Sequence, residues 1–247
     1  MYFRCRAVIR ALALVGMTTF FVSSCASNPS LKESSDYLSD MEIAQIAEKT
    51  QHDNIAIRNY QRAAKDSPQS DEPKKALVRI YQQQGSTQQV LFWLQDILKN
   101  NPKSEFAYYH LGQLMQQQAS YNSAITYYLY LKNSPRYQSA ALNNIAVMLQ
   151  LHEQNKLATQ CFYKGIRIYP SDEKLRYNAA LSFITQDNLH DPANVAMKDA
   201  LLKTGDLQIQ GMLKNASKTH MPVTVKSGHV AHFHSDLLSQ VRSWCGE

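Results

Sequence analysis

Glycine and proline are scarce in this chain, with eight of each among 247 residues. An all-β protein of this size needs many tight turns of the kind these residues form, so their scarcity favours helix. Dense runs of lysine and arginine are also missing, and a nucleic-acid interface needs such a concentrated basic patch. Hydrophobic residues make up 44% of the chain and charged residues 19%, which is typical of a globular protein. We therefore expect an all-α globular protein that does not bind nucleic acid.

Recognisable catalytic motifs are missing as well. The sequence contains no glycine-rich phosphate loop, no Gly-x-Ser-x-Gly elbow and no His-Glu-x-x-His helix. His229, His232 and His234 form a small cluster, but zinc sites need three or four well-placed ligands. We expect neither an enzyme nor a bound cofactor or metal, and a metal-dependent enzyme built on these histidines is the less favoured alternative.

The first 24 residues have the pattern of an export signal. Arg4, Arg6 and Arg10 precede an uncharged, largely apolar stretch at residues 11–22. These twelve residues fall short of the roughly 20 that a membrane-spanning helix needs. Cleavage would remove the three arginines and no acidic residue, which takes the formal net charge from +6 to +3. The mature chain is therefore only mildly basic.

A cysteine follows the apolar stretch directly. Val22-Ser23-Ser24-Cys25 resembles the lipobox of bacterial lipoproteins, in which the cysteine receives diacylglycerol before cleavage. The resemblance implies lipidation of Cys25, and Ala26 in the next position implies transfer to the outer membrane. The alternative is an ordinary secretory signal with a cysteine near its cleavage site. The polar residues that follow predict a flexible tether over residues 25–36.

Prolines recur with a period near 34. Pro68, Pro102, Pro135 and Pro170 are separated by 34, 33 and 35 residues, and each follows an apolar-periodic helical pattern. This period indicates an array of helix–turn–helix units that share a continuous core. We expect five units, near 37–70, 71–104, 105–138, 139–172 and 173–206.

The units resemble the tetratricopeptide repeat (TPR). The fourth unit carries its apolar and small positions in full: Leu142, Ile145, Ala146, Leu149, Ala158, Phe162, Gly165 and Pro170. The fifth unit fits only with one inserted residue, and there Asp191-Pro192 predicts a helix start with Ala193, Met197 and Ala200 facing inward. The resemblance implies a TPR superhelix over residues 37–206.

The tail at residues 207–247 does not repeat this pattern. Its apolar residues are spaced by three or four positions, as one face of a helix requires: Val230, Phe233, Leu237, Val241 and Trp244. We expect this helix to cap the open end of the solenoid, because solenoids need a polar outer cap. A docking helix for a partner is the alternative.

Two cysteines remain in the mature chain. Cys161 and Cys245 could form a disulfide in an oxidising compartment, which would join the tail to the fourth unit. The alternative is two unpaired thiols, since the sequence does not give their separation.

In TPR proteins the first helix of each pair lines a groove that binds peptides. The repeat alignment implies that the groove here contains basic, aromatic and amide side chains: Lys75, Arg79, Phe106, Tyr109, Gln113, Asn143, Asn144, Val147, Lys174, Tyr177 and Asn178. Asn144 and Asn178 occupy equivalent positions, and an amide can donate and accept hydrogen bonds to a peptide backbone. The alternative is that these polar residues are simply solvated.

The segments at 141–149, 169–172 and 175–182 resemble the TadD family of tight-adherence (Flp) pilus assembly lipoproteins. The resemblance implies a non-enzymatic, outer-membrane scaffold on the periplasmic face that helps a secretin to localise or oligomerise. Other scaffold roles, as an adaptor for cell-wall hydrolases or a pilotin of another pilus, are the alternatives.

Overall fold

The computed structural model describes residues 29–185, 189–216 and 232–246. Over these ranges the chain forms twelve α-helices and no strand. The helices are α1 (Pro29–Lys49), α2 (Asp53–Asp66), α3 (Glu72–Gln83), α4 (Thr87–Asn100), α5 (Glu105–Gln117), α6 (Tyr121–Leu129), α7 (Gln138–Leu151), α8 (Asn155–Ile168), α9 (Glu173–Ile184), α10 (Pro192–Lys203), α11 (Leu207–Ala216) and α12 (Ser235–Gly246). None of these helices is both long enough and apolar enough to cross a membrane. The predicted all-α class is confirmed.

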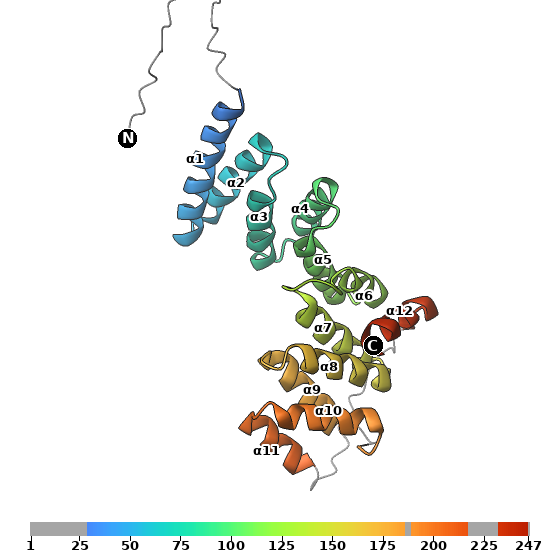
Figure 1. Ribbon diagram of the computed structural model, residues 1–247. Helices are drawn as coiled ribbons and strands as arrows, with labels where there is room; N and C mark the ends of the chain where they lie inside the picture. Colours follow the sequence, from blue (N-terminus) through green and yellow to red (C-terminus); the bar gives the residue numbers. More distant parts are fainter. Residues whose placement is uncertain (1–28, 186–188, 217–231, 247) are drawn as a thin grey trace, which may run out of the picture.

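The first ten helices pack as five consecutive pairs. The pairs follow the five expected units, except that α1 begins at Pro29, before residue 37, and α7 begins at Gln138, one residue before its unit. The second helix of each of the first four pairs also packs on the first helix of the next pair. Figure 1 shows the resulting elongated stack, with α1 at one end and α11 at the other. This nearest-neighbour packing is what defines a solenoid.

Three second helices end where the proline spacing requires. Ser67, Asn101 and Tyr169 are the C-cap residues of α2, α4 and α8, and each stands directly before a proline. Their φ angles are −131°, −131° and −125°, well outside the helical range, because proline disfavours a helical residue before it. In the third unit α6 already ends at Leu129, before Pro135.

The carbonyl oxygens of these three prolines accept side-chain hydrogen bonds from the helix that follows. The donors are Lys74 Nζ to Pro68, the Tyr108 hydroxyl to Pro102 and an Arg176 nitrogen to Pro170, at 2.6, 2.8 and 2.8 Å. In each case the donor lies six residues after the proline. These bonds satisfy a carbonyl that a helix end would otherwise leave unpaired, and they link one unit to the next.

Small residues allow the closest approaches between helices. A Cβ built on Gly112 would lie 2.6 Å from a ring carbon of Tyr128. That ring is fully buried, and its hydroxyl is hydrogen-bonded to Gln116 and Asn144. The ring is therefore held in place, and only glycine fits between α5 and α6 at this point.

We predict that Gly112→Ala is net destabilising by about 1 kcal/mol, because overpacking costs about 1–3 kcal/mol and alanine regains about 1 kcal/mol of helix propensity. Gly211→Ala on α11 is the matched control, since its new methyl group would meet nothing within 4 Å. It should stabilise the protein by up to about 1 kcal/mol. Urea unfolding of both variants measures the two effects, and a stabilising Gly112→Ala would refute the close approach.

In the fifth unit, α10 begins at the residue that the sequence predicts. The Asp191 side chain accepts a hydrogen bond from the backbone N–H of Ala193 at 2.9 Å, and Pro192 is the first helical residue. The buried face of α10 differs from the prediction. Met197 is buried as expected, but Asn194 and Leu201 complete the face, whereas Ala193 and Ala200 are only partly buried.

The predicted position of the C-terminal cap is wrong. α11 follows α10 and packs on α9 and α10, in the place that the first helix of a sixth pair would take. The amphipathic tail helix α12 packs instead on α8 and α6, and Figure 1 shows it beside the middle of the stack. Leu237, Val241 and Trp244 are buried there. Val230 lies outside the described residues, and Phe233 precedes the helix.

The flexible tether predicted for residues 25–36 extends too far along the chain. α1 begins at Pro29, so residues 29–36 are helical and not part of a flexible segment. Proline favours the first turn of a helix, because its fixed φ suits the helix and its missing N–H would have no partner there. Cys25 and the signal segment lie outside the described residues.

Candidate functional site

Two adjoining hollows lie along the first helices of the first three pairs, α1, α3 and α5, and the connection before α7. One has a volume of about 430 Å³ and the other about 400 Å³. The residues that line them are Met41, Gln45, Glu48, Lys49, Tyr60, Asp71, Glu72, Lys75, Ala76, Arg79, Asn101, Lys103, Ser104, Glu105, Phe106, Arg136 and Tyr137. Glu72 and Arg79 line both hollows, so the two form one surface. We call this surface the first-helix groove.

Charges of both signs alternate along the first-helix groove. Lys75 Nζ lies 2.8 Å from Glu72 Oε1, and an Arg79 nitrogen lies 3.6 Å from Glu48 Oε1. The Tyr60 hydroxyl donates to the other oxygen of Glu48 at 2.6 Å. Both ion pairs are partly exposed, so each contributes little to stability. Such pairs can be exchanged for charges on a bound partner at small cost.

Aromatic rings lie among these charges. The Lys75 ammonium lies 5.9 Å from the centroid of Phe106, within the range of a cation–π contact. Tyr137 stacks on Tyr109 with centroids 4.7 Å apart, and the Arg136 guanidinium lies 5.3 Å from the Tyr137 ring. Aromatic side chains and arginine are the residues that most often dominate binding energy at protein interfaces.

His110 lies beneath this surface on α5. Its ring is 4.2 Å from that of Phe106, and its Nδ1 is 3.1 Å from Gln82 Nε2. Burial, followed by the positive charge of Arg79, lowers the pKa of His110 to about 4. The imidazole is therefore neutral at physiological pH, and it joins α3 to α5 below the groove.

Only some of the predicted groove residues lie at the first-helix groove. Lys75, Arg79 and Phe106 line the first-helix groove, and Tyr109 stacks on one of its residues. Gln113 donates to the Tyr109 hydroxyl at 3.2 Å. On α9, Lys174 and Tyr177 are exposed to solvent, and Val147 on α7 is half-buried.

The predicted asparagines belong to a hydrogen-bonded chain inside the protein. Asn178 Nδ2 donates to Asn143 Oδ1 at 2.8 Å, and Asn143 Nδ2 donates to Asn144 Oδ1 at 3.2 Å. Asn144 Nδ2 then donates to the Tyr128 hydroxyl at 3.0 Å. Asn143 is buried, and Asn144 and Asn178 are half-buried. This chain links the third, fourth and fifth units, and so these amides are already engaged in joining repeats.

Several groove residues were not predicted from the sequence. Arg136 and Tyr137 follow Pro135 in the connection before α7, whereas the predicted groove residues all lie on first helices. Glu48 on α1 was not among the predicted groove residues, all of which come from later units.

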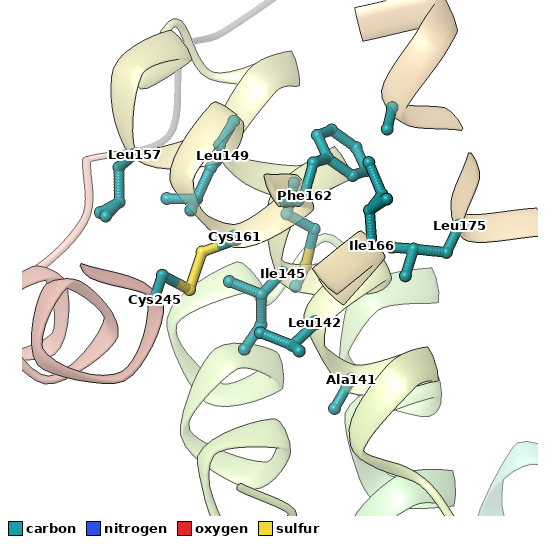
Figure 2. Packing of buried hydrophobic residues seen from close by; sticks show 14 of the residues in the cluster. Ala141, Leu142, Ile145, Leu149, Leu157, Cys161, Phe162, Ile166, Leu175 and Cys245 are labelled. Carbon is teal, nitrogen blue, oxygen red and sulfur yellow. A yellow bond between two sulfur atoms is a disulfide. The ribbon is translucent and has the colours of Figure 1, made fainter. Parts of the chain in front are cut away.

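A disulfide joins Cys161 on α8 to Cys245 on α12, with the two Cα atoms 4.6 Å apart. Figure 2 shows the bridge beside Ile145 and Leu149 in the buried core of the fourth unit. At the other end of the tail, Asn122 on α6 donates to the His232 carbonyl at 3.0 Å and accepts from the His234 N–H at 3.2 Å. The described segment at residues 232–246 is therefore attached to the solenoid near both of its ends.

Among the described residues, no group of three or more histidine, cysteine or acidic side chains is placed to hold a metal ion. His229 of the histidine cluster lies outside them.

No protein-family model matches the chain, and no curated protein matches it in sequence. Its fold is similar to that of solved TPR-like repeat proteins. A crystal structure of MamA protein matches with a TM-score of 0.55 at 16% identity, covering 76% of this chain and 97% of that one. A second crystal structure of MamA matches with a TM-score of 0.52 at 17% identity, over 72% and 98%. A structure from the functional characterisation of Pseudomonas aeruginosa pilF matches with a TM-score of 0.56 at 11% identity, over 76% and 91%. The chain therefore has the TPR superhelical fold.

Proposed function

We propose that this protein is a non-enzymatic scaffold that binds a segment of a partner protein in its first-helix groove and assists assembly of a pilus secretion system of the Flp/Tad type. Lipid on Cys25 holds the scaffold at the periplasmic face of the outer membrane. The partner is the outer-membrane secretin or another subunit of the same machine.

The observation that carries the proposal is the continuity of the first-helix groove over α1, α3, α5 and the start of α7. The two hollows suit an extended chain segment better than a small molecule, because they are open, adjoining and lined by both charges and rings. Weak surface ion pairs at the groove, such as Arg79 with Glu48, leave polar groups available for exchange. Phe106 and Tyr137 supply apolar area for anchoring side chains of the partner.

The cellular location rests on the lipobox-like segment and on the disulfide. Disulfides persist in oxidising compartments such as the periplasm and are rare in the cytosol, so the Cys161–Cys245 bridge supports export. Anchoring by lipid confines the groove to the membrane surface, which raises its effective concentration toward a membrane-bound partner. The TadD resemblance and the fold shared with pilF support a pilus system as the context.

The groove is tested by photo-crosslinking in intact cells. A crosslinking amino acid at the position of Phe106 should trap the secretin, whereas one at Phe92 should not. Phe92 is a matched control, because it is an exposed phenylalanine on α4, a second helix. The double variant Phe106→Ala/Arg136→Ala should reduce co-purification of the secretin about tenfold or more, since hot-spot residues each contribute about 2 kcal/mol.

The control for that double variant is Phe92→Ala/Arg58→Ala, which removes the same side chains from exposed positions on α4 and α2. Equal loss of secretin in both variants, or equal crosslinking from both positions, would place the binding surface elsewhere.

The anchor is tested separately with Cys25→Ala. Membrane fractionation should show loss of the protein from the outer membrane, and the count of surface pili should fall. Normal pili with an unanchored protein would eliminate the tethering part of the proposal while leaving the groove intact.

A further inference from the structure

A third hollow, of about 530 Å³, lies where the tail helix α12 meets the third and fourth units. We call it the tail pocket. Its lining comes from the end of α6, the loop that follows α6, the first residue of α7, and the surfaces of α8 and α12. The lining residues are Leu129, Lys132, Asn133, Gln138, Lys164, Ser239, Gln240, Ser243 and Trp244. Among the described residues, its polar part consists of two lysines and five amide or hydroxyl side chains, with no carboxylate. The tail pocket is separate from the first-helix groove and shares no lining residue with it.

Among the described residues, the charged side chains that line the tail pocket are all positive. In the first-helix groove, carboxylates stand beside the cations. Within the described part of the chain, neither Lys132 nor Lys164 has a carboxylate oxygen within 4.0 Å. Lys164 is half-buried, so its charge is partly removed from water, with no carboxylate partner among the residues that the structure describes. Such a charge favours binding of an anion.

The ammonium of Lys164 is already oriented. It donates one hydrogen bond to the backbone carbonyl of Trp244, near the end of α12. An ammonium has three donors, so two remain for a ligand. A cation at this helix end is also stabilised by the helix dipole. Gln138 is positioned by the Tyr169 hydroxyl, which donates to its Oε1 at 2.6 Å.

We propose that the tail pocket binds a phosphate-type oxyanion carried on a small polar group. Several neutral donors around two lysines match an anion with many acceptor oxygens, and lysine binds phosphate as a point charge. The lining contains no arginine, the residue that forms planar, bidentate pairs with carboxylates. The volume exceeds that of a bare ion and accommodates a phosphate ester. A soluble phosphate ester and the headgroup of an anionic phospholipid both present this chemistry.

The tail pocket exists only while α12 is docked. Ser239, Gln240, Ser243 and Trp244 come from α12, and the residue after Trp244 is the disulfide-bonded Cys245. A ligand that contacts both α12 and the body of the solenoid therefore stabilises the docked tail, by linkage. Phosphate binding and the disulfide then support each other.

Calorimetric titration of the purified full chain with inorganic phosphate, at constant ionic strength, tests the site. We expect saturable binding. Lys132→Met should weaken it about tenfold or more, as expected for loss of a charged hydrogen bond. Lys132 is exposed, and its side chain forms no ion pair within the described ranges, so its variant should keep the fold. Lys99→Met is the matched control, because Lys99 is exposed on α4 away from the tail, and its binding constant should equal that of the unchanged chain.

Vesicles distinguish the two sources of phosphate. Retention on phosphatidylglycerol vesicles, above that on phosphatidylcholine and reduced by Lys132→Met alone, identifies a lipid headgroup as the ligand. Binding of inorganic phosphate with no such preference identifies a soluble phosphate. Reduction of the disulfide should weaken either form of binding. The site is refuted if neither probe binds saturably, or if Lys99→Met weakens binding as much as Lys132→Met.

Discussion

Removal of the Cys161–Cys245 disulfide is expected to lower the free energy of unfolding of the C-terminal half of the solenoid by about 4 kcal/mol. The bridge closes a loop with a sequence separation of 84 residues, and a crosslink over a loop of this length removes much conformational entropy from the unfolded chain. The loop contains the whole fifth unit and α11. The variant is Cys161→Ala/Cys245→Ala, which leaves no unpaired thiol, and urea unfolding followed by circular dichroism measures the change.

The same experiment separates the crosslink from the packing of the tail. Leu237, Val241 and Trp244 are buried against the core, so part of the tail contact survives without the disulfide. A helix of twelve residues is marginal by itself, and hydrogen exchange should therefore show α12 opening before α8. Addition of a reductant to the unchanged chain should reproduce the loss. Equal unfolding curves for the oxidised and reduced chains would show that the loop is not a determinant of stability.

The repeat architecture was predictable because its determinants are local. Proline spacing fixed the ends of α2, α4 and α8 through the residue that precedes each proline. The small and apolar positions of the fourth unit indicated the inner faces of α7 and α8, and Phe162 on α8 is fully buried. Each of these features acts within about 34 residues of sequence, which is the range over which a periodic pattern carries information.

The location of the tail was not predictable for the opposite reason. The stripe on α12 indicates only that one face is buried, and both the end of the stack and the surface of α6 and α8 could accept it. The choice depends on partners far away in sequence, such as Asn122, which pairs with the backbone of residues 232 and 234. The candidate site shows the same limit. Lys75, Arg79 and Phe106 follow from helical periodicity, whereas the hydrogen bonds of Asn144 and Asn178 depend on the stacking of three units.

The two ends of the solenoid therefore differ in how they are held. The first three units carry the open first-helix groove and no crosslink, whereas the asparagine chain joins the third, fourth and fifth units. The disulfide loop runs from α8 through the fifth unit to α12. In a solenoid each unit is stabilised chiefly by its neighbours, so the N-terminal units have more freedom to adjust around a bound segment. The C-terminal units, which are held by more links, should change less in conformation when a segment binds.

Lowering the pH is expected to destabilise the protein through His110, which lies below the first-helix groove. The pKa of His110 is about 4 in the folded protein, against an ordinary value of 6.5, because burial disfavours the charged ring. The unfolded chain therefore binds the proton more tightly than the folded chain between these two values. Stability contributed by His110 is complete above about pH 6.5 and is lost as the pH falls toward 4, by about 3 kcal/mol in total.

Urea unfolding at pH 7, 5.5 and 4.5 measures this dependence, and His110→Gln isolates it from the titration of carboxylates. The variant should show a shallower loss of stability across this range than the unchanged chain, whatever its stability at pH 7. Arg79→Gln is the second variant, because the charge of Arg79 lowers the pKa of His110 and its removal should reduce the pH dependence in part. Identical slopes in all three proteins would mean that His110 is protonated without penalty in the folded state. The result bears on the groove directly, since a partner carboxylate that neutralises Arg79 would raise the pKa of His110 and be bound more tightly at lower pH.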